Sequence, residues 1–382
     1  MGLKLSGKPI RTGSYERHAT WLELFYDLVY VVVIDALVHR ITDVDGAHLG
    51  LARYLAFAAL FVPVWWAWTG HTLFQNRFDP DDLPHRLLTL LQMLAASFMA
   101  IFATDALDAG ANGFALSYVV VRALLLAMYW RVHERGGAYA DVTSLLLTGF
   151  SLGAALWLVS IAVPSPYKFA FWAAGIAVDM ATPWIGAKRL ARVSVHATHL
   201  PEHLGLLTII VLGESVLSIV GGVETSSFGW AVLVPVLFGF LLLGAIWWLY
   251  FECLEASLLG AKYTNGQLAI YGHLPVYMGL VTLAAGIRYA INGELAGEET
   301  IWLLCGGLLL FMVPLEVIHG ARLGGERLRR YAAASLLLDA GLAATGIVAA
   351  GLVPSLQLVL VATLYTAYVI IESSSVTPGV GR

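Results

Sequence analysis

Between Phe228 and Phe251 the chain reads FGWAVLVPVLFGFLLLGAIWWLYF, a run without a charged side chain. A helix rises about 1.5 Å per residue, so about 20 apolar residues cross the roughly 30 Å hydrocarbon layer of a bilayer. The run is continuous and does not alternate between apolar and polar residues, which favours a helix over a barrel strand. This stretch therefore predicts a transmembrane helix.

Similar apolar runs occur along the whole chain and predict an all-α bundle of about twelve spans. The runs cover residues 20–39, 52–74, 87–106, 113–131, 142–163, 168–187, 203–223, 228–251, 267–291, 300–319, 330–350 and 352–372. Only a few residues separate the last two runs, so the sequence leaves open whether they are two full spans.

The composition supports a membrane environment over the whole length. Of the 382 residues, 59% are hydrophobic and 13% are charged, and the mean hydropathy is +0.77. Soluble domains carry about 25% charged residues, so a water-soluble fold is excluded and the lipid bilayer is the expected partner. The net charge of -4 does not favour a nucleic-acid partner.

The distribution of positive charge predicts the orientation of the spans. Cytoplasmic loops of membrane proteins carry an excess of lysine and arginine. With the N-terminus placed in the cytoplasm, 17 of the 22 basic residues fall on the cytoplasmic side. Four fall on the opposite side and one within a span; these are Arg40, Arg53, Lys168, Arg288 and, within the fourth span, Arg122. The sequence therefore predicts both termini in the cytoplasm.

Two matches at a common offset of 182 residues indicate an internal duplication. Residues 22–25 (LELF) align with 204–207 (LGLL), and 64–66 (VWW) align with 246–248 (IWW). Six spans in each half would place both halves in the same orientation, as in transporters built from parallel repeats. We therefore expect one six-helix half at residues 1–197 and a second at 198–382.

Two motifs resemble those of a known family. The stretch ATWLELFYDLVY at residues 19–30 is similar to a signature of the bacterial low-temperature-requirement protein A (LtrA) family, and TIIVLGESVL at 208–217 is similar to its second signature. The likeness extends from about Arg17 to Glu372. It implies an integral protein of the bacterial plasma membrane, and it implies no particular activity.

Seven carboxylates fall within the predicted spans, where an ionisable side chain costs about 3 kcal/mol on insertion scales. They are Glu23, Asp27, Asp35, Asp179, Glu214, Glu316 and Asp339. Arg122 is the one arginine near the middle of a span, so pairing cannot neutralise all seven. We therefore expect some of these acids to be protonated, hydrated or bound to a cation.

Glu23 and Asp27 are one turn apart and share a face of the first span. Such a pair suits a proton carrier or a cation ligand; the alternative is a structural role in capping and hydrogen bonding, with Arg122 as counter-ion. Glu214 lies halfway along the seventh span. By analogy with repeat transporters, we expect Glu23, Asp27 and Glu214 to converge on a polar cavity between the halves, with Arg122 close by.

Three further residues complete the candidate substrate- or ion-binding set. Asp179 precedes Pro183 by one turn, and a proline can kink a helix and free a carbonyl. The hydroxyl of Ser215 can orient the neighbouring Glu214. Tyr30 stands where the LtrA family more often has phenylalanine, which keeps the ring and adds a hydroxyl.

Histidines between the sixth and seventh spans, His196, His199 and His203, have helical spacing. Pro201 interrupts them and no cysteine is near, so we predict no metal site there. The sequence holds no phosphate-binding loop, nucleophile elbow or HExxH motif. We therefore expect no catalytic residues, no cofactor and no enzyme activity.

These features favour a secondary transporter or a permease coupled to a proton or another cation, with an unknown small-molecule or ionic substrate. A channel-like cation path would use the same acids, and the sequence does not separate the two. A structural or regulatory membrane protein, in which the acids serve helix packing, is a further alternative. An intramembrane lipid-handling enzyme would need a histidine-containing cluster at one membrane face, and no such cluster is evident in the sequence.

Overall fold

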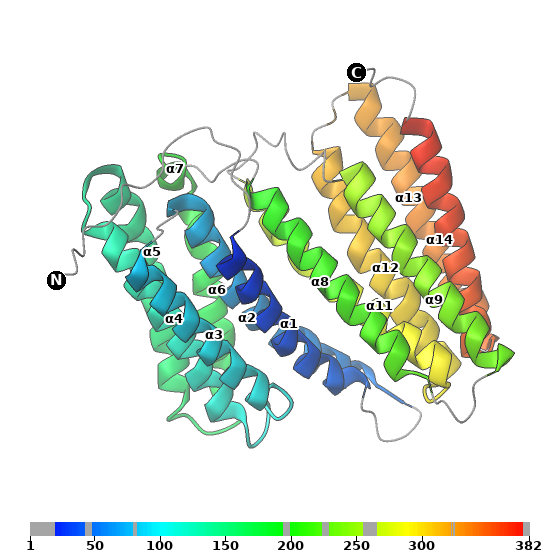
Figure 1. Cartoon of the computed structure of the whole chain (residues 1–382), viewed down its shortest axis with the longest axis horizontal. Coiled ribbons are helices and arrows are strands. Elements are labelled where there is room, and N and C mark those ends of the chain that lie inside the picture. Colours follow the sequence, from blue (N-terminus) through cyan, green and yellow to red (C-terminus); the bar gives the residue numbers. More distant parts are fainter. Residues whose placement is uncertain are drawn as a thin grey trace. The chain divides into compact units, whose positions relative to one another are not determined.

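The computed structural model describes residues 20–42, 48–78, 82–193, 199–223, 229–254, 266–321, 323 and 325–376, and these ranges contain helices and no strand (Figure 1). The helices are α1 (Trp21–Thr42), α2 (Leu51–Phe78), α3 (Leu83–Ala103), α4 (Ala111–His133), α5 (Gly137–Ser160), α6 (Lys168–Ile185), the short α7 (Ala187–Leu190), α8 (His199–Gly221), α9 (Trp230–Trp248), α11 (Gln267–Asn292), α12 (Gly297–Gly320), α13 (Gly325–Val348) and α14 (Pro354–Val376). A π-helical turn at Leu249–Leu254 follows α9.

Each of the twelve predicted runs lies on one of these helices. Ten of the helices are long and apolar enough to cross a bilayer, which confirms an all-helical membrane protein. The other two long helices are α1, which carries four charged residues, and α6, which is 18 residues long and contains Lys168 and Asp179. The count of twelve spans therefore stays a prediction.

The last two predicted runs form two separate helices. Helix α13 ends at Val348, a 3-10 turn covers Ala349–Gly351, and α14 begins at Pro354. Proline is favoured at the first position of a helix, because it lacks only an N–H that would have no partner there. Both helices are among the ten that are long and apolar enough to span a bilayer.

The described chain forms two compact units, which we treat separately. The first comprises described residues within Met1–Leu37, Ala58–His203 and Lys262–Gln267, and the second those within Val38–Phe57, Leu204–Ala261 and Leu268–Arg382. The first unit thus takes most of α1 and α2, all of α3–α6, and the first turn of α8.

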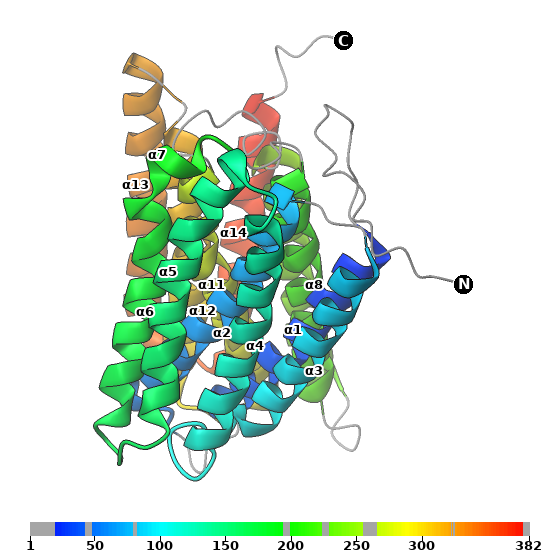
Figure 2. The ribbon, with the colours of Figure 1, turned by 90° about the vertical axis from the view of Figure 1, so that its left-hand side faces the viewer.

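In the first unit, α3, α4, α5 and α6 pack against one another in chain order (Figure 2). Glycines of α5 let α6 approach closely. A methyl group on Gly153 would lie 2.2 Å from Asp179 Oδ1, and one on Gly149 would lie 2.1 Å from Thr182 Oγ1. Small residues at such contacts are typical of helix pairs in membranes, where close backbone approach replaces the hydrophobic effect.

In the second unit, α9 packs on α14, and α12 packs on α13 and α14. Helices α11 and α12 meet through glycines, because a methyl group on Gly279 would lie 2.6 Å from the Gly307 carbonyl oxygen. Large apolar side chains such as Leu336, Leu337 and Val348 are exposed on α13, as expected for a surface that contacts lipid.

The two tryptophan pairs behind the predicted duplication have different environments. Trp65 and Trp66 on α2 are buried, whereas Trp247 and Trp248 on α9 are about half exposed. Their common offset is therefore not matched by common packing, and the two-repeat arrangement stays a prediction.

Candidate ion-binding site

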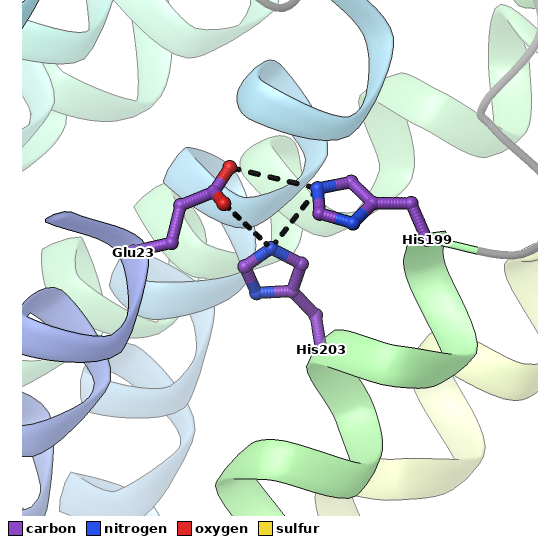
Figure 3. Close-up of side chains that lie close together, drawn as sticks. All are labelled: Glu23, His199 and His203. Carbon is purple, nitrogen blue, oxygen red and sulfur yellow. Dashed lines mark hydrogen bonds and ion pairs between the residues drawn. The ribbon is translucent and has the colours of Figure 1, made fainter. Parts of the chain in front are cut away.

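Three buried side chains of the first unit meet in a cluster that we call the Glu23 cluster: Glu23 on α1, and His199 and His203 on α8 (Figure 3). Glu23 Oε1 lies 3.5 Å from His199 Nε2, and Glu23 Oε2 lies 3.6 Å from His203 Nε2. The two Nε2 atoms are 3.2 Å apart. Both imidazoles therefore present the same ring nitrogen to each other and to the carboxylate.

The start of α8 explains why the two histidines point the same way. The helix begins at His199, so Pro201 falls in the first turn, where the backbone N–H groups have no intrahelical acceptor and proline is tolerated. His199 and His203 are then four residues apart on one helix face. Pro201 therefore does not interrupt the helical spacing of the two histidines, contrary to the prediction from the sequence.

The start of α1 fixes the position of Glu23. The Thr20 backbone N–H donates to Glu23 Oε2 at 2.6 Å, and the Glu23 backbone N–H donates to Thr20 Oγ1 at 3.3 Å. This reciprocal pattern is a capping box, and the carboxylate is also favoured by the positive end of the helix dipole. Glu23 thus caps α1 and faces the histidines with the same carboxylate.

A second layer of carboxylates stands behind the imidazoles. Asp27 Oδ2 lies 3.9 Å from His203 Nδ1, and Glu202 Oε2 lies 3.7 Å from His199 Nδ1. The indole of Trp68 donates a hydrogen bond of 2.7 Å to Asp27 Oδ1. Glu23 and Asp27 therefore act on the same histidine from opposite sides of its ring, which agrees with the predicted shared face.

This arrangement can hold a positive charge. One ligand atom from each of Glu23, His199 and His203 lies within 4.8 Å of the others, and carboxylate and imidazole are both metal ligands as well as proton acceptors. The donor set therefore suits a proton or a metal ion.

Arg122 and Asp179 form a separate buried pair. Arg122 Nη2 lies 2.9 Å from Asp179 Oδ2, and both side chains are 0% exposed. The Tyr118 hydroxyl donates to the same carboxylate oxygen at 3.0 Å, and the guanidinium carbon lies 4.4 Å from the centre of the Phe150 ring. Asp179 is thus the ion-pair partner of Arg122, and this pairing was not predicted from the sequence.

The other candidate residues have local partners. The Tyr26 hydroxyl donates to the Tyr30 hydroxyl at 3.2 Å, and both rings are buried. The Ser215 hydroxyl donates to the Val211 carbonyl of its own helix at 3.0 Å. Glu214 and Ser215 belong to the second unit, so the convergence of Glu214 with Glu23 and Asp27 stays a prediction.

Sequence reasoning missed His199 and His203 as partners of Glu23. Their spacing of four residues was a usable signal, because Pro201 between them lies in the first turn of α8, where proline is tolerated. No pattern in a single sequence indicates that α8 meets α1 at this point. His196, the third histidine of that stretch, lies outside the described residues.

Comparison with known proteins agrees with the two signature motifs. Residues 18–370 match the sequence model described as bacterial low temperature requirement A protein (LtrA). An uncharacterized protein of Rhizobium meliloti (strain 1021) is 27% identical over 341 residues, which cover 80% of this chain and 81% of that relative. The family match includes α1 and α8 and nearly all of the remaining helices. The chain belongs to the bacterial LtrA family.

Proposed function

We propose that the protein is a secondary transporter or permease whose substrate or coupling ion is a cation, and that it is not an enzyme. The observation that carries the proposal is the buried Glu23 cluster with Asp27 beside it. Ionisable side chains in helices surrounded by lipid are costly, and they generally mark ion pathways or proton relays.

The proposal assigns different roles to the candidate residues. Glu23, His199 and His203 hold the cation, and Asp27 orients His203. Arg122 and Asp179 neutralise each other and link α4 to α6 through their side chains. Glu214 and Ser215 on α8 are a further position on the path, and Tyr30 on α1 is a separate candidate residue of the first unit. Proton, metal ion and small cationic solute are the substrate classes that fit an acidic site.

The proposed arrangement is twelve spans in the bacterial plasma membrane, with both termini in the cytoplasm and two parallel six-helix repeats at 1–197 and 198–382. Ten long apolar helices and the charge asymmetry of the loops support it. Cysteines placed at Asn112 and Glu298 should then react with a membrane-impermeant reagent added to intact cells. Labelling only after permeabilisation would contradict the orientation.

Reconstitution into liposomes tests the function. Purified protein is expected to carry saturable flux of at least one cation from a panel of protons, alkali metals, magnesium, manganese and zinc, above protein-free liposomes. Glu23→Gln should reduce this flux at least about tenfold, because the cation loses a charged ligand. Glu326→Gln is the matched control, since Glu326 is exposed and pairs with Arg330 within one turn.

A permease moves its substrate along a concentration or charge gradient, and flux that saturates and follows a counter-ion would separate it from a channel. Absence of flux for every cation, with protein that is folded and inserted, would contradict the proposal. Equal flux in Glu23→Gln and wild type would leave transport in place and remove the Glu23 cluster from it.

A further inference from the structure

We infer that Glu23, His199 and His203 form a binding site for a divalent transition-metal ion of the zinc class. The inference specifies the ion at the cation site of the proposed function, and it does not require that the ion be transported. Glu23 supplies carboxylate oxygen from α1, and the histidines supply two Nε2 atoms from the first turns of α8.

The spacing of the donor atoms fits a common ion. Ligands about 2.0–2.1 Å from a tetrahedral zinc ion lie roughly 3.3–3.4 Å from one another. Here the two Nε2 atoms are 3.2 Å apart. The carboxylate faces the two nitrogens with different oxygens, because Oε1 lies 3.5 Å from His199 Nε2 and Oε2 lies 3.6 Å from His203 Nε2. The donors therefore stand close to the separations of ligands on one metal.

The kinds of donor atom select the class of ion. Imidazole nitrogens suit zinc and neighbouring transition metals, whereas magnesium and calcium prefer shells made of oxygen. Two nitrogens and one oxygen give three protein ligands, which is the number found where zinc keeps one position open for water or another ligand. Such an incomplete shell suits an exchangeable ion.

The surroundings of the histidines match those of metal-bound histidine. A metal-ligating imidazole usually donates its other N–H to a carboxylate, carbonyl or water, which fixes the tautomer. His203 Nδ1 faces Asp27 Oδ2 at 3.9 Å, and His199 Nδ1 faces Glu202 Oε2 at 3.7 Å. These carboxylates favour protons on both Nδ1 atoms.

With those tautomers, both Nε2 lone pairs point toward each other and toward the Glu23 carboxylate. A cation placed among the three atoms attracts all of them. His203 Nδ1 and Asp27 Oδ2 are buried and make no hydrogen bond to any described residue. A shift of about 1 Å, which ligation by His203 could produce, would bring this pair within hydrogen-bonding distance. Asp27 is therefore placed to orient the His203 ring when His203 binds a metal ion.

Metal binding to the full-length protein in detergent tests the site. The protein is stripped with a chelator, loaded with zinc, desalted and assayed for metal by mass spectrometry, and the affinity is measured by calorimetry. Wild type is expected to retain about one zinc per chain. His203→Ala should lower the affinity at least about 100-fold, and Asp27→Asn about 10–100-fold, as for other residues that orient metal ligands.

His273→Gln is the matched control for histidine loss. His273 is buried in α11, where its ring hydrogen-bonds to Tyr250 and to the Ala269 carbonyl. This variant should bind zinc as wild type does. Size-exclusion profiles and circular dichroism establish that each variant is folded. If His203→Ala does not fold, zinc is expected to raise the Tm of wild type while magnesium at the same concentration does not.

Two results would overturn the inference. One is folded wild-type protein that retains no stoichiometric zinc and shows no zinc-dependent rise in Tm. The other is His203→Ala protein that binds zinc with wild-type affinity. Zinc binding without cation flux in liposomes would contradict the proposed function and leave the metal site in place. Cation flux without zinc binding would support the proposed function and contradict the metal site.

Discussion

Two groups of buried ionisable side chains in the first unit are built differently. In the Arg122–Asp179 pair, a permanent positive charge lies 2.9 Å from the carboxylate and Tyr118 adds a hydrogen bond. In the Glu23 cluster, the carboxylate faces two imidazoles, whose positive charge depends on a bound proton. The Arg122–Asp179 pair thus contains a permanent cation, the guanidinium. The Glu23 cluster contains none, so it suits a proton or metal ion that can exchange.

The partner of a buried acid decides whether that acid is a candidate for ion transport. An arginine does not lose its charge in a protein, so the carboxylate that it pairs with has little use as an exchangeable cation site. An acid that faces imidazoles can exchange a proton or a metal ion. Sorting buried acids by their partners therefore separates residues that hold helices together from residues that bind ions.

The largest expected effect comes from breaking the permanent pair. Arg122→Met leaves the buried Asp179 carboxylate without its charge partner, and removing one member of a buried ion pair typically costs about 3–5 kcal/mol. The free energy of unfolding in mixed detergent micelles measures this. The double variant Arg122→Met/Asp179→Leu should recover most of the loss, because no buried charge remains. A single variant within about 1 kcal/mol of wild type would contradict the structural role.

The next effect is the response of stability to metal. At zinc concentrations 100 times the dissociation constant, binding to the folded state alone should stabilise wild type by about 2.7 kcal/mol. His203→Ala should lose this gain and Arg122→Met should keep it, since the two groups are separate. The measurement is the free energy of unfolding with and without zinc. An equal zinc response in His203→Ala and wild type would contradict zinc binding at the Glu23 cluster.

The helices could be predicted from the sequence, whereas most contacts between their buried side chains could not. Every helix that was expected from an apolar run is present, because 20 apolar residues in lipid have few alternatives to a helix. The shared face of Glu23 and Asp27 followed from their spacing. The partners of these acids did not, because His199 lies on α8 and the contact between α8 and α1 depends on tertiary packing. The same holds for Asp179 on α6 and Arg122 on α4.

The count of buried charges was incomplete in detail, and its expectation that some acids are protonated or bind another cation stays a prediction. Counting seven acids against Arg122 predicted that some acids need another cation. Such a count does not identify Asp179 as the ion-pair partner of Arg122, because it treats every acid in a span as equivalent. Pro201 shows the opposite error, because a proline that would break a helix interior is harmless in the first turn of α8.

A smaller effect is expected at the start of α1, where the cluster depends on a helix cap. Thr20→Ala removes the hydroxyl that accepts from the Glu23 N–H, which typically costs about 1 kcal/mol. Thr20→Ser keeps the hydroxyl and is the control. We expect Thr20→Ala to weaken zinc binding several-fold as well, measured by calorimetry, because Glu23 loses part of its support. Unchanged affinity with reduced stability would restrict the cap to a structural role.

The smallest effect lies outside the membrane spans, at a second permanent pair. Burial raises the pKa of Asp82, but the hydrogen bond from Arg131, the His85 backbone N–H and the nearby positive charges outweigh it and lower the pKa below 3.8. A lowered folded-state pKa stabilises the fold above the unfolded pKa, and this contribution is lost as the pH falls through the folded value.

Asp82→Asn tests this contribution, because asparagine retains the helix cap and removes the charge. The stability difference between wild type and Asp82→Asn should be constant near neutral pH and should shrink below about pH 4, where the aspartate becomes neutral. Thermal unfolding of both proteins from pH 7 to pH 3 measures it. A difference that grows on acidification would show that the sign of the shift is wrong.

The contrast between a fixed and an exchangeable cation is tested most directly by X-ray absorption at the zinc edge of the loaded protein. We expect nitrogen and oxygen ligands at about 2.0–2.1 Å, scattering from two imidazoles, and no sulfur near 2.3 Å. His203→Ala should lose one imidazole contribution, and Arg122→Met should leave the spectrum unchanged. A sulfur shell, or a spectrum with no imidazole scattering, would contradict the assignment of the ion to Glu23, His199 and His203.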